Sequence, residues 1–350
     1  MMDNHEENVD EEIVEEYGST PVDLERMHNH YYLGNEVRLN FIDPSIRDIP
    51  AEAYQNYTAL TDLRVLPWGR RRIILRTIGE RAFCRCIKLR RINQFLKDGG
   101  VLRLEDEAFA SCWRLVGELV IPSSVLWVGD ACFQECFSIT SVVFETSTTG
   151  TVVEIKFAAF NNCTKLSSAT LPPTLECIPW SCFNRCTALV YVPIPPTVVE
   201  VGEDAFADCI SLSLMDLPES VDDIGRKAFY NCTALTTVTI RTASFDLRMG
   251  DGVFDRCDSL SKIRTYPWHW GKLLSSMDND ANFLDKFFNG ALASSINLYS
   301  CYGAHILEAM NEQPSLFYRV LRTFQHQRFE TNAPRTAMTA QNTTNDRIEE

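Results

Sequence analysis

The chain of 350 residues lacks any run of 18 apolar residues, which is the length that a membrane-spanning helix requires. It also lacks a basic start followed by an apolar stretch, which is the pattern of a secretory signal peptide. Its first 25 residues instead contain ten acidic residues and neither Lys nor Arg. We therefore expect no membrane span and an intracellular location, cytoplasmic or nuclear.

Signatures of catalysis and of metal binding are also missing. The sequence contains neither a P-loop nor a GxGxxG motif. The six histidines form no recognisable triad or zinc pattern: His5, His28, His30, His269, His305 and His326. Paired carboxylates such as Asp222 and Asp223 are interpreted as solvated turn residues rather than as an acid–base pair. We expect no enzyme, no cofactor and no metal ion.

What the sequence does contain is the motif A-(F/Y)-x-x-(C/Y)-x-x-(L/I), with Cys or Val in place of Ala in three repeats, which recurs nine times at intervals of 23 to 29 residues. A fixed period of this size predicts a solenoid, in which each repeat buries its apolar face against its neighbours. Counting from the aromatic residue, position 0 holds Tyr54, Phe83, Phe109, Phe133, Phe160, Phe183, Phe206, Phe229 and Phe254. Position +3 holds Tyr57, Cys86, Cys112, Cys136, Cys163, Cys186, Cys209, Cys232 and Cys257, and position +6 is Leu or Ile throughout.

The rest of the repeat predicts its local structure. Position −5 is apolar in all nine repeats, and positions +8 to +11 alternate outward and inward, as in Thr237 to Ile240. This period of two predicts a short strand. The spacing of three between Phe, Cys and Leu predicts a turn of 3₁₀- or α-helix packed behind that strand. The Phe and Cys positions then form internal ladders, in which each residue faces its own copy one repeat away.

The stretch AFxxCxxLxxVxIP, preceded by V-x-x-I-G as in residues 221–240, resembles the BspA type of leucine-rich repeat. The resemblance covers about residues 40 to 265. It implies an α+β repeat solenoid of short parallel strands and helical turns that acts in protein or surface recognition, without catalytic residues. Bacterial members of this family usually carry export signals, which this sequence does not show.

Composition changes at both ends of the repeats suggest the domain limits. Residues 1–35 are acidic and are predicted to be a disordered tail, and residues 36–50 a strand that caps the first repeat. The solenoid of nine repeats is placed at residues 36–265. Apolar residues spaced at three and four predict a helical C-terminal cap at residues 266–330. Residues 331–350 are predicted to be a second disordered tail.

The thirteen cysteines could suggest a metal or redox site. Eight of them occupy position +3, where we interpret Cys as a small buried residue. An intracellular chain would keep these thiols reduced, and stacked side chains point the same way rather than at each other. Cys84, Cys132 and Cys182 lie beside the motif Phe, and we expect them to be the more exposed thiols and the better redox candidates.

Charge is uneven along this chain of net charge −14. Ten basic residues, opposed only by Glu80, lie between positions 64 and 91: Arg64, Arg70, Arg71, Arg72, Arg76, Arg81, Arg85, Lys88, Arg90 and Arg91. They can form an ordinary solvated face, or a contact for the acidic N-terminal tail or an acidic partner. Nucleic acid is the weakest interpretation, because interleaved aromatic residues are missing and the overall charge is repulsive.

Outward positions of the predicted strands supply the candidate recognition face. Tyr191 and Leu214 are adjacent there on consecutive repeats. We therefore predict partner binding by Tyr191, Leu214, Asp216, Thr170 and Thr239, or by Arg71 and Arg72 of the basic cluster. The function we expect is that of a monomeric, non-enzymatic protein-interaction scaffold. The alternatives are an adhesin-like surface protein and an adaptor that recruits a partner through residues 266–330.

Overall fold

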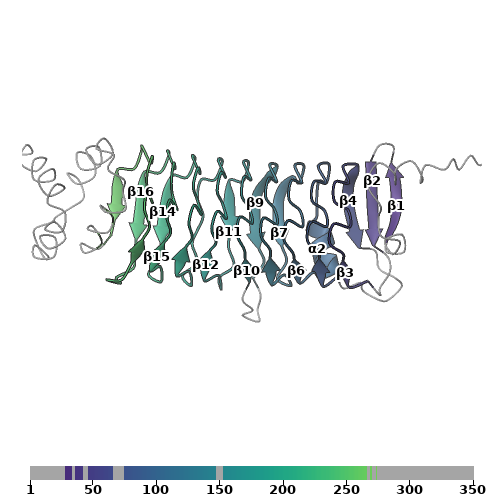
Figure 1. The fold of residues 1–350 in the computed structure, drawn as a ribbon, viewed down its shortest axis with the longest axis horizontal. Coiled ribbons are helices and arrows are strands. Elements are labelled where there is room, and N and C mark those ends of the chain that lie inside the picture. Colours follow the sequence, from purple (N-terminus) through teal and green to yellow (C-terminus); the bar gives the residue numbers. More distant parts are fainter. Residues whose placement is uncertain are drawn as a thin grey trace, which may run out of the picture.

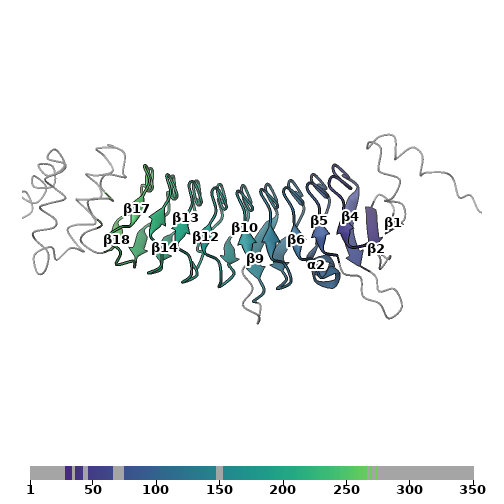
Figure 2. The same ribbon diagram turned by 60° about the horizontal axis from the view of Figure 1, so that its bottom comes forward.

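The computed structural model describes residues 28–33, 36–41, 46–65, 75–146 and 153–265, together with His269 and Leu273. Nine coils stack along one axis into an elongated rod (Figures 1 and 2). We number the coils by their motif aromatic residue, so that coil 1 contains Tyr54, coil 6 Phe183 and coil 9 Phe254. The predicted solenoid is thus present, while most of the predicted helical cap, all of residues 331–350 and the basic residues Arg70 to Arg72 lie outside the described residues.

The first set of strands forms one long side of the rod, which we call the strand face. Its members are β1 (His28–Leu33), β2 (Glu36–Phe41) and β4 (Leu60–Val65), then β7 (Gly117–Ile121), β9 (Ile139–Phe144) and β11 (Ser168–Thr170), then β14 (Leu214–Leu217), β16 (Thr237–Ile240) and β18 (Lys262–Arg264). All pairings within these three sheets are parallel except β1 with β2, which is antiparallel. Strand β1 lies within residues 1–35, so the predicted disordered tail is wrong for residues 28–33, which instead extend the sheet.

A second set of strands, each two residues long, runs along the opposite limb of the coils. It contains β3 (Asp48–Ile49), β5 (Thr77–Ile78), β6 (Arg103–Leu104), β8 (Trp127–Val128) and β10 (Glu154–Ile155), then β12 (Cys177–Ile178), β13 (Glu200–Val201), β15 (Asp223–Ile224) and β17 (Arg248–Met249). The second residue of each strand is the apolar −5 position. This sheet was not predicted, because a strand of two residues shows no alternation in the sequence.

Both sets of strands are interrupted at coil 6, and proline explains each interruption. In neighbouring coils the residue at −4 donates its N–H to the preceding coil, as Gly202 does to the Ile178 carbonyl at 2.8 Å. Coil 6 has Pro179 at this position and Pro193 on the strand face. Since proline has no N–H to donate, β10 and β12 do not pair, and coil 6 keeps only an isolated bridge between Ser168 and Tyr191.

Coil 2 carries a short helix where its neighbours carry a strand. This helix, α2 (Asn93–Gly99), lies between β4 and β7 and ends at Gly100 with a left-handed φ of 62°. The Asn93 side chain takes over the missing strand contacts, because its amide nitrogen donates to the Glu118 carbonyl and its oxygen accepts from Val120 N–H, at 2.8 and 3.1 Å. The side-chain amide thereby continues the sheet across the helix.

The motif limb consists of successive β-turns rather than the predicted helical turn. In coil 6, the N–H groups of Cys182, Asn184 and Cys186 donate to carbonyls three residues back. The N–H groups that alternate with these donate to carbonyls of the next coil: Ser181 to Glu203, Phe183 to Ala205 and Arg185 to Ala207, at 2.8 to 2.9 Å. The same three bonds, from positions −2, 0 and +2, occur at all eight junctions between the nine coils. We call them the turn ladder.

The turn ladder depends on an unusual backbone conformation. All seventeen described non-glycine residues with positive φ lie at positions −2 and +2, from Glu52 to Arg256, with φ between 49° and 61°. A β-turn with positive φ at its third residue is of type II, which normally favours Gly or Asn. Each such residue costs roughly 1–2 kcal/mol. The hydrogen bond that it gives to the next coil offsets this cost.

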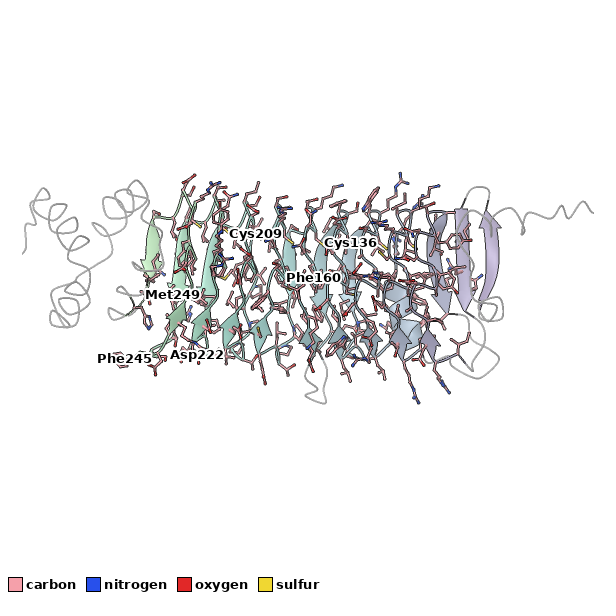
Figure 3. All side chains as sticks on the ribbon, viewed as in Figure 1. Cys136, Phe160, Cys209, Asp222, Phe245 and Met249 are labelled. Atoms are coloured by element: carbon pink, nitrogen blue, oxygen red, sulfur yellow. The ribbon has the colours of Figure 1, made fainter. Side chains whose placement is uncertain are left out.

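The motif aromatic residues form a continuous stack inside the rod. Ring centroids of successive coils are 5.2 to 5.7 Å apart, with interplanar angles of at most 13°. Phe83 to Phe254 are fully buried. Figure 3 labels Phe160 in this interior, whereas Phe245 lies at the edge of the rod with 66% of its surface exposed. Offset or edge-on contacts between buried rings add to the hydrophobic stabilisation.

The cysteines at +3 form a second ladder, and each thiol has a hydrogen-bond partner. Every Sγ lies 3.1 to 3.3 Å from the carbonyl oxygen of the motif aromatic residue in the preceding coil, from Cys86 on Tyr54 to Cys257 on Phe229. These carbonyls also accept the N–H of the residue three positions on, such as Cys186 on Phe183. Cysteine is therefore a weak donor between coils as well as a small buried residue.

The three thiols predicted to be most exposed are buried, and that prediction is wrong. Cys84, Cys132 and Cys182 have exposed fractions of 5%, 0% and 1%. They directly follow or precede the motif Phe, and each contacts the preceding coil, as Cys132 does through the Phe109 backbone. All twelve described cysteines are free thiols, and Cys177 alone among them is partly exposed. Burial, followed by the carboxylates of Glu200 and Asp223, raises its pKa to about 12.

Removal of one ring tests the aromatic stack. Phe206→Ala should lower the free energy of unfolding by about 3–5 kcal/mol, because it leaves a cavity between two buried rings. Phe245→Ala, the same change at an exposed position, should cost within about 0.5 kcal/mol. Thermal unfolding of both variants measures the difference. Equal melting of Phe206→Ala and the parent would contradict the stack.

Alkaline pH tests the thiol ladder. Burial raises the pKa of the seven ladder thiols Cys86, Cys112, Cys136, Cys163, Cys186, Cys209 and Cys232 well above the usual range. Their contribution to stability is therefore complete below the unfolded pKa of about 8.5 and is lost as the pH rises toward the folded pKa. Each thiol exposed by unfolding lowers the unfolding free energy by up to about 1.4 kcal/mol per pH unit above 8.5.

Two variants at Cys209 separate ionisation from hydrogen bonding. In both Cys209→Ser and Cys209→Ala, unfolding should release about one proton fewer between pH 8.5 and 10.5. The free energy of unfolding should therefore fall less steeply with pH than in the parent. Only Cys209→Ser keeps a donor to the Phe183 carbonyl, so Cys209→Ala should be the less stable at pH 7. Chemical unfolding across this pH range measures both effects. A slope that neither variant alters would show that Cys209 is not a buried, protonated thiol.

Candidate recognition surfaces

The strand face brings the predicted contact residues into register. Position +8 is occupied by Ser168, Tyr191, Leu214 and Thr237 on four consecutive coils. A bridge joins Ser168 to Tyr191, and strand pairing places Leu214 opposite Thr237. The Ser213 N–H donates to the Val190 carbonyl at 3.2 Å, which fixes the step from coil 6 to coil 7. Inward residues such as Val192 and Met215 are buried at +9. The backbone that carries the outward side chains of coil 6 is therefore hydrogen-bonded to both neighbouring coils.

The apolar part of this face is a cluster of three side chains, Val190, Tyr191 and Leu214, which we call the coil-6 patch. Their exposed fractions are 47%, 40% and 43%. The sequence identified Tyr191 and Leu214, whereas Val190 at position +7 was missed. The break in strand pairing at Pro193 lies beside this patch. Three adjacent exposed apolar side chains are a better contact candidate than single ones.

The polar residues predicted for this face surround the coil-6 patch. Thr170 lies on β11, while Asp216 and Thr239 lie opposite each other on β14 and β16. Asp216 accepts two hydrogen bonds from Arg241, both at 2.7 Å, and this pairing lowers the pKa of the Asp216 carboxyl. The pair is neutral as a whole. The other predicted contacts, Arg71 and Arg72, lie outside the described residues.

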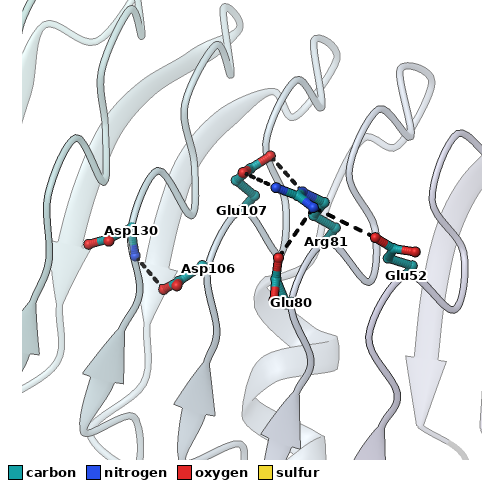
Figure 4. A network of polar contacts seen from close by, with 6 residues as sticks. All are labelled: Glu52, Glu80, Arg81, Asp106, Glu107 and Asp130. Atoms are coloured by element: carbon teal, nitrogen blue, oxygen red, sulfur yellow. Dashed lines mark hydrogen bonds and ion pairs between the residues drawn. The ribbon is translucent and has the colours of Figure 1, made fainter.

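The basic cluster of the sequence is not one surface in the structure. Arg81 forms an ion-pair network with three carboxylates of consecutive coils: Glu52 at 3.7 Å, Glu80 at 3.3 Å and Glu107 at 2.9 Å (Figure 4). Hydrogen bonding from Arg81 lowers the pKa of Glu107. Arg64 pairs with Asp62, which also binds Arg38. Glu80 is therefore not the only opposing charge, because acids 25 to 30 residues away in sequence become neighbours when coils stack.

Other exposed groups could not be anticipated from single motifs. On the second sheet, the Trp127 ring lies between the Arg103 guanidinium at 4.4 Å and the Lys156 ammonium at 4.2 Å. Phe157 and Trp180 occupy position −3 with 48% and 57% exposed. Position −3 is charged in six of the nine repeats, so an aligned table of the repeats would have revealed these two aromatic residues.

Metal binding and membrane insertion find no structural support in the described part of the chain. Within it, no group of three or more His, Cys, Asp or Glu side chains is placed to hold a metal ion. None of its helices combines the length and the apolar character needed to span a bilayer. The buried histidine His269 has a structural role, since its ring nitrogens contact Thr265 and the Ser244 carbonyl at 2.7 and 2.8 Å.

Comparison with solved structures finds several bacterial leucine-rich repeat proteins. One from Bacteroides ovatus is 22% identical over 68% of this chain and 69% of its own, with a TM-score of 0.45. One from T. pallidum is 29% identical over 37% of this chain and 59% of its own, with a TM-score of 0.34. A leucine-rich cell surface protein from Faecalibacterium prausnitzii is 16% identical over 75% and 96%, with a TM-score of 0.30. No curated protein sequence matches.

The family assignment rests on the repeat itself. The BspA type leucine rich repeat region matches residues 47–152 and 153–268 in six copies, which is more than half of the chain. These limits agree with the nine stacked coils from Ile49 to Ile263. The resemblance seen in the motif is therefore confirmed, and the chain belongs to the BspA-type leucine-rich repeat family.

Proposed function

We propose that this chain is a protein-recognition scaffold that binds a partner protein through the strand face, centred on the coil-6 patch. The observation that carries the proposal is the juxtaposition of Val190, Tyr191 and Leu214, each at least 40% exposed, on adjacent coils. Binding energy at protein interfaces concentrates in a few central aromatic and apolar residues that become desolvated. The patch has this composition, with one Tyr between two aliphatic side chains.

The surroundings of the patch define the chemistry of the partner. Ser168, Thr170 and Thr237 supply hydroxyl groups, and the Asp216–Arg241 pair is already neutral. A partner segment that is apolar at its centre and carries uncharged polar groups around it would fit this surface. A strongly charged partner would gain no complementary charge there, and burying its charge would cost free energy.

We also propose an intracellular, reducing compartment for this protein. The twelve described cysteines are free, and eight of them donate hydrogen bonds as thiols, which disulfide formation would abolish. Localisation of a tagged chain in its native cell tests this proposal. Detection at the cell surface would instead favour the adhesin-like role.

Substitution of the patch tests the recognition proposal. Tyr191→Ala with Leu214→Ser should abolish capture of the main partner while stability stays within about 1 kcal/mol of the parent, since both side chains lie outside the core. Phe157→Ala with Val199→Ser is the matched control, because these side chains are 48% and 44% exposed on another part of the rod. Quantitative affinity purification from the native cell compares the variants.

Two outcomes of this experiment would contradict binding at the coil-6 patch. Loss of the partner only in the Phe157, Val199 variant would place the site on the second sheet. Unchanged capture in both, with loss on Arg71→Glu and Arg72→Glu, would assign binding to the basic N-terminal region.

A further inference from the structure

We propose that the acidic N-terminal segment, residues 1–27, binds to a basic, aromatic surface on the edge of coils 2 to 4 of its own chain. This surface lies at positions +4, +5, +7 and +8, where each coil passes from its turns into the strand face. We call it the turn-to-strand edge. The inference is independent of the proposed function, since the coil-6 patch lies two coils beyond this surface.

The surface combines cations with exposed apolar groups. Lys88, Arg91 and Arg114 are exposed and form no ion pair with another described residue. Between them lie Trp113, with 46% of its surface exposed, and Val116, with 50% exposed. The Trp113 ring contacts the Phe137 ring of the next coil, at 6.2 Å between centroids. Stacking places these groups side by side, since the Val116 N–H donates to the Arg90 carbonyl at 3.0 Å.

The charge of this edge differs from that of the whole chain. In coils 1 to 8, no Asp or Glu occupies positions +4 to +7, although the chain carries 47 acidic residues. The acids nearest this edge lie at +8: Asp62 of coil 1, which already pairs with Arg38 and Arg64, and Glu118, which takes the +8 register in coil 3. Lys88 and Arg114, both at +5, therefore have no acid at positions +4 to +7 of the neighbouring coils, whereas Arg91 at +8 lies next to Asp62. Arg81, by contrast, already forms ion pairs with three carboxylates.

Residues 1–27 have the complementary composition. They contain ten carboxylates and one Arg, and the stretch DEEIVEEY at positions 10–17 interleaves acids with Ile13, Val14 and Tyr17. Acids can pair with Lys88, Arg91 and Arg114 while these apolar side chains cover Trp113, Val116 and Phe137. Such a pairing explains both the charge and the exposed rings of the edge, whereas a purely ionic contact would leave the rings unexplained.

The point of attachment makes this contact reachable. The segment joins β1, which pairs with β2 and then β4 of coil 1, so coil 3 is about 20 Å from β1 at strand spacing. An extended chain of this length spans up to about 90 Å. The segment can therefore reach the edge with many residues to spare. Its effective concentration there would be in the millimolar range, which favours a contact that is weak in isolation.

Carboxylate–amine cross-linking of the full-length protein tests the proposal. A carbodiimide joins Asp or Glu directly to Lys, and peptide mass spectrometry locates the bond. Cross-links from residues 3–25 should form at Lys88 at least about tenfold more than at Lys97, an exposed lysine of the same coil on α2. They should disappear in about 0.5 M salt, where exposed ion pairs are screened. Equal yields at Lys88 and Lys97 would overturn the proposal.

Matched variants distinguish a specific contact from general attraction. Arg91→Glu with Arg114→Glu should abolish the Lys88 cross-links, whereas Arg47→Glu with Arg76→Glu, the same charge change at position −7 of coils 1 and 2, should leave them. Ile13→Ser, Val14→Ser and Tyr17→Ser should reduce them severalfold although every carboxylate remains. Retention of the cross-links in the Arg91, Arg114 variant contradicts the site.

A mixture of isotope-labelled and unlabelled protein identifies the occupant. Cross-links within one chain support the proposal, and cross-links mainly between chains would assign the edge to a second copy instead.

Discussion

The turn ladder is the interaction on which the rest of the structure depends. Three backbone hydrogen bonds at each of the eight junctions, all 2.7 to 3.0 Å long, hold one coil on the next. They require a left-handed conformation at positions −2 and +2, which costs roughly 1–2 kcal/mol for a residue other than glycine. A single coil would lack the hydrogen bonds to a neighbouring coil that offset this cost. The conformation is therefore stable only in a stack, and stability is shared between neighbouring coils.

Exact repetition of the turn ladder also positions the side chains of both interior and surface. Because positions −2, 0 and +2 meet their counterparts at every junction, the rings from Tyr54 to Phe254 stack and each thiol meets the carbonyl of the previous ring. The same register brings Tyr191 and Leu214 to the same position on adjacent coils, and it places Trp113 beside Phe137. Prolines and insertions then vary single coils without breaking the stack. The proposed recognition surfaces therefore combine residues of neighbouring coils that lie one repeat apart in the sequence.

The sequence predicted the period, the identity of the stacked rings and the strand at +8 to +11, because each depends on a pattern that recurs nine times. The motif limb was predicted only in part. Phe, Cys and Leu three residues apart suit both a helical turn and a run of β-turns, and no Gly or Asn signal marks the positive φ at residues such as Arg81 or Glu135. The partners of Arg81 and the Asn93 contacts with β7 arise only when coils stack, so no single repeat encodes them. Of the candidate site, the sequence supplied Tyr191 and Leu214, and stacking added Val190.

Amide hydrogen exchange across one junction tests the turn ladder most directly. The amides of Asp204, Phe206 and Asp208 lie in turns, outside any helix or strand, yet each donates to coil 8, with which β14 of coil 7 also pairs through β16. They should exchange as slowly as the strand amides of Met215 and Leu217, because both sets open only when coils separate. Ile210 at the corner of coil 7 bonds only two residues back, to Asp208, and should exchange faster. Rapid exchange at Asp204, Phe206 and Asp208 with protected strands would show that the strands alone hold the coils together.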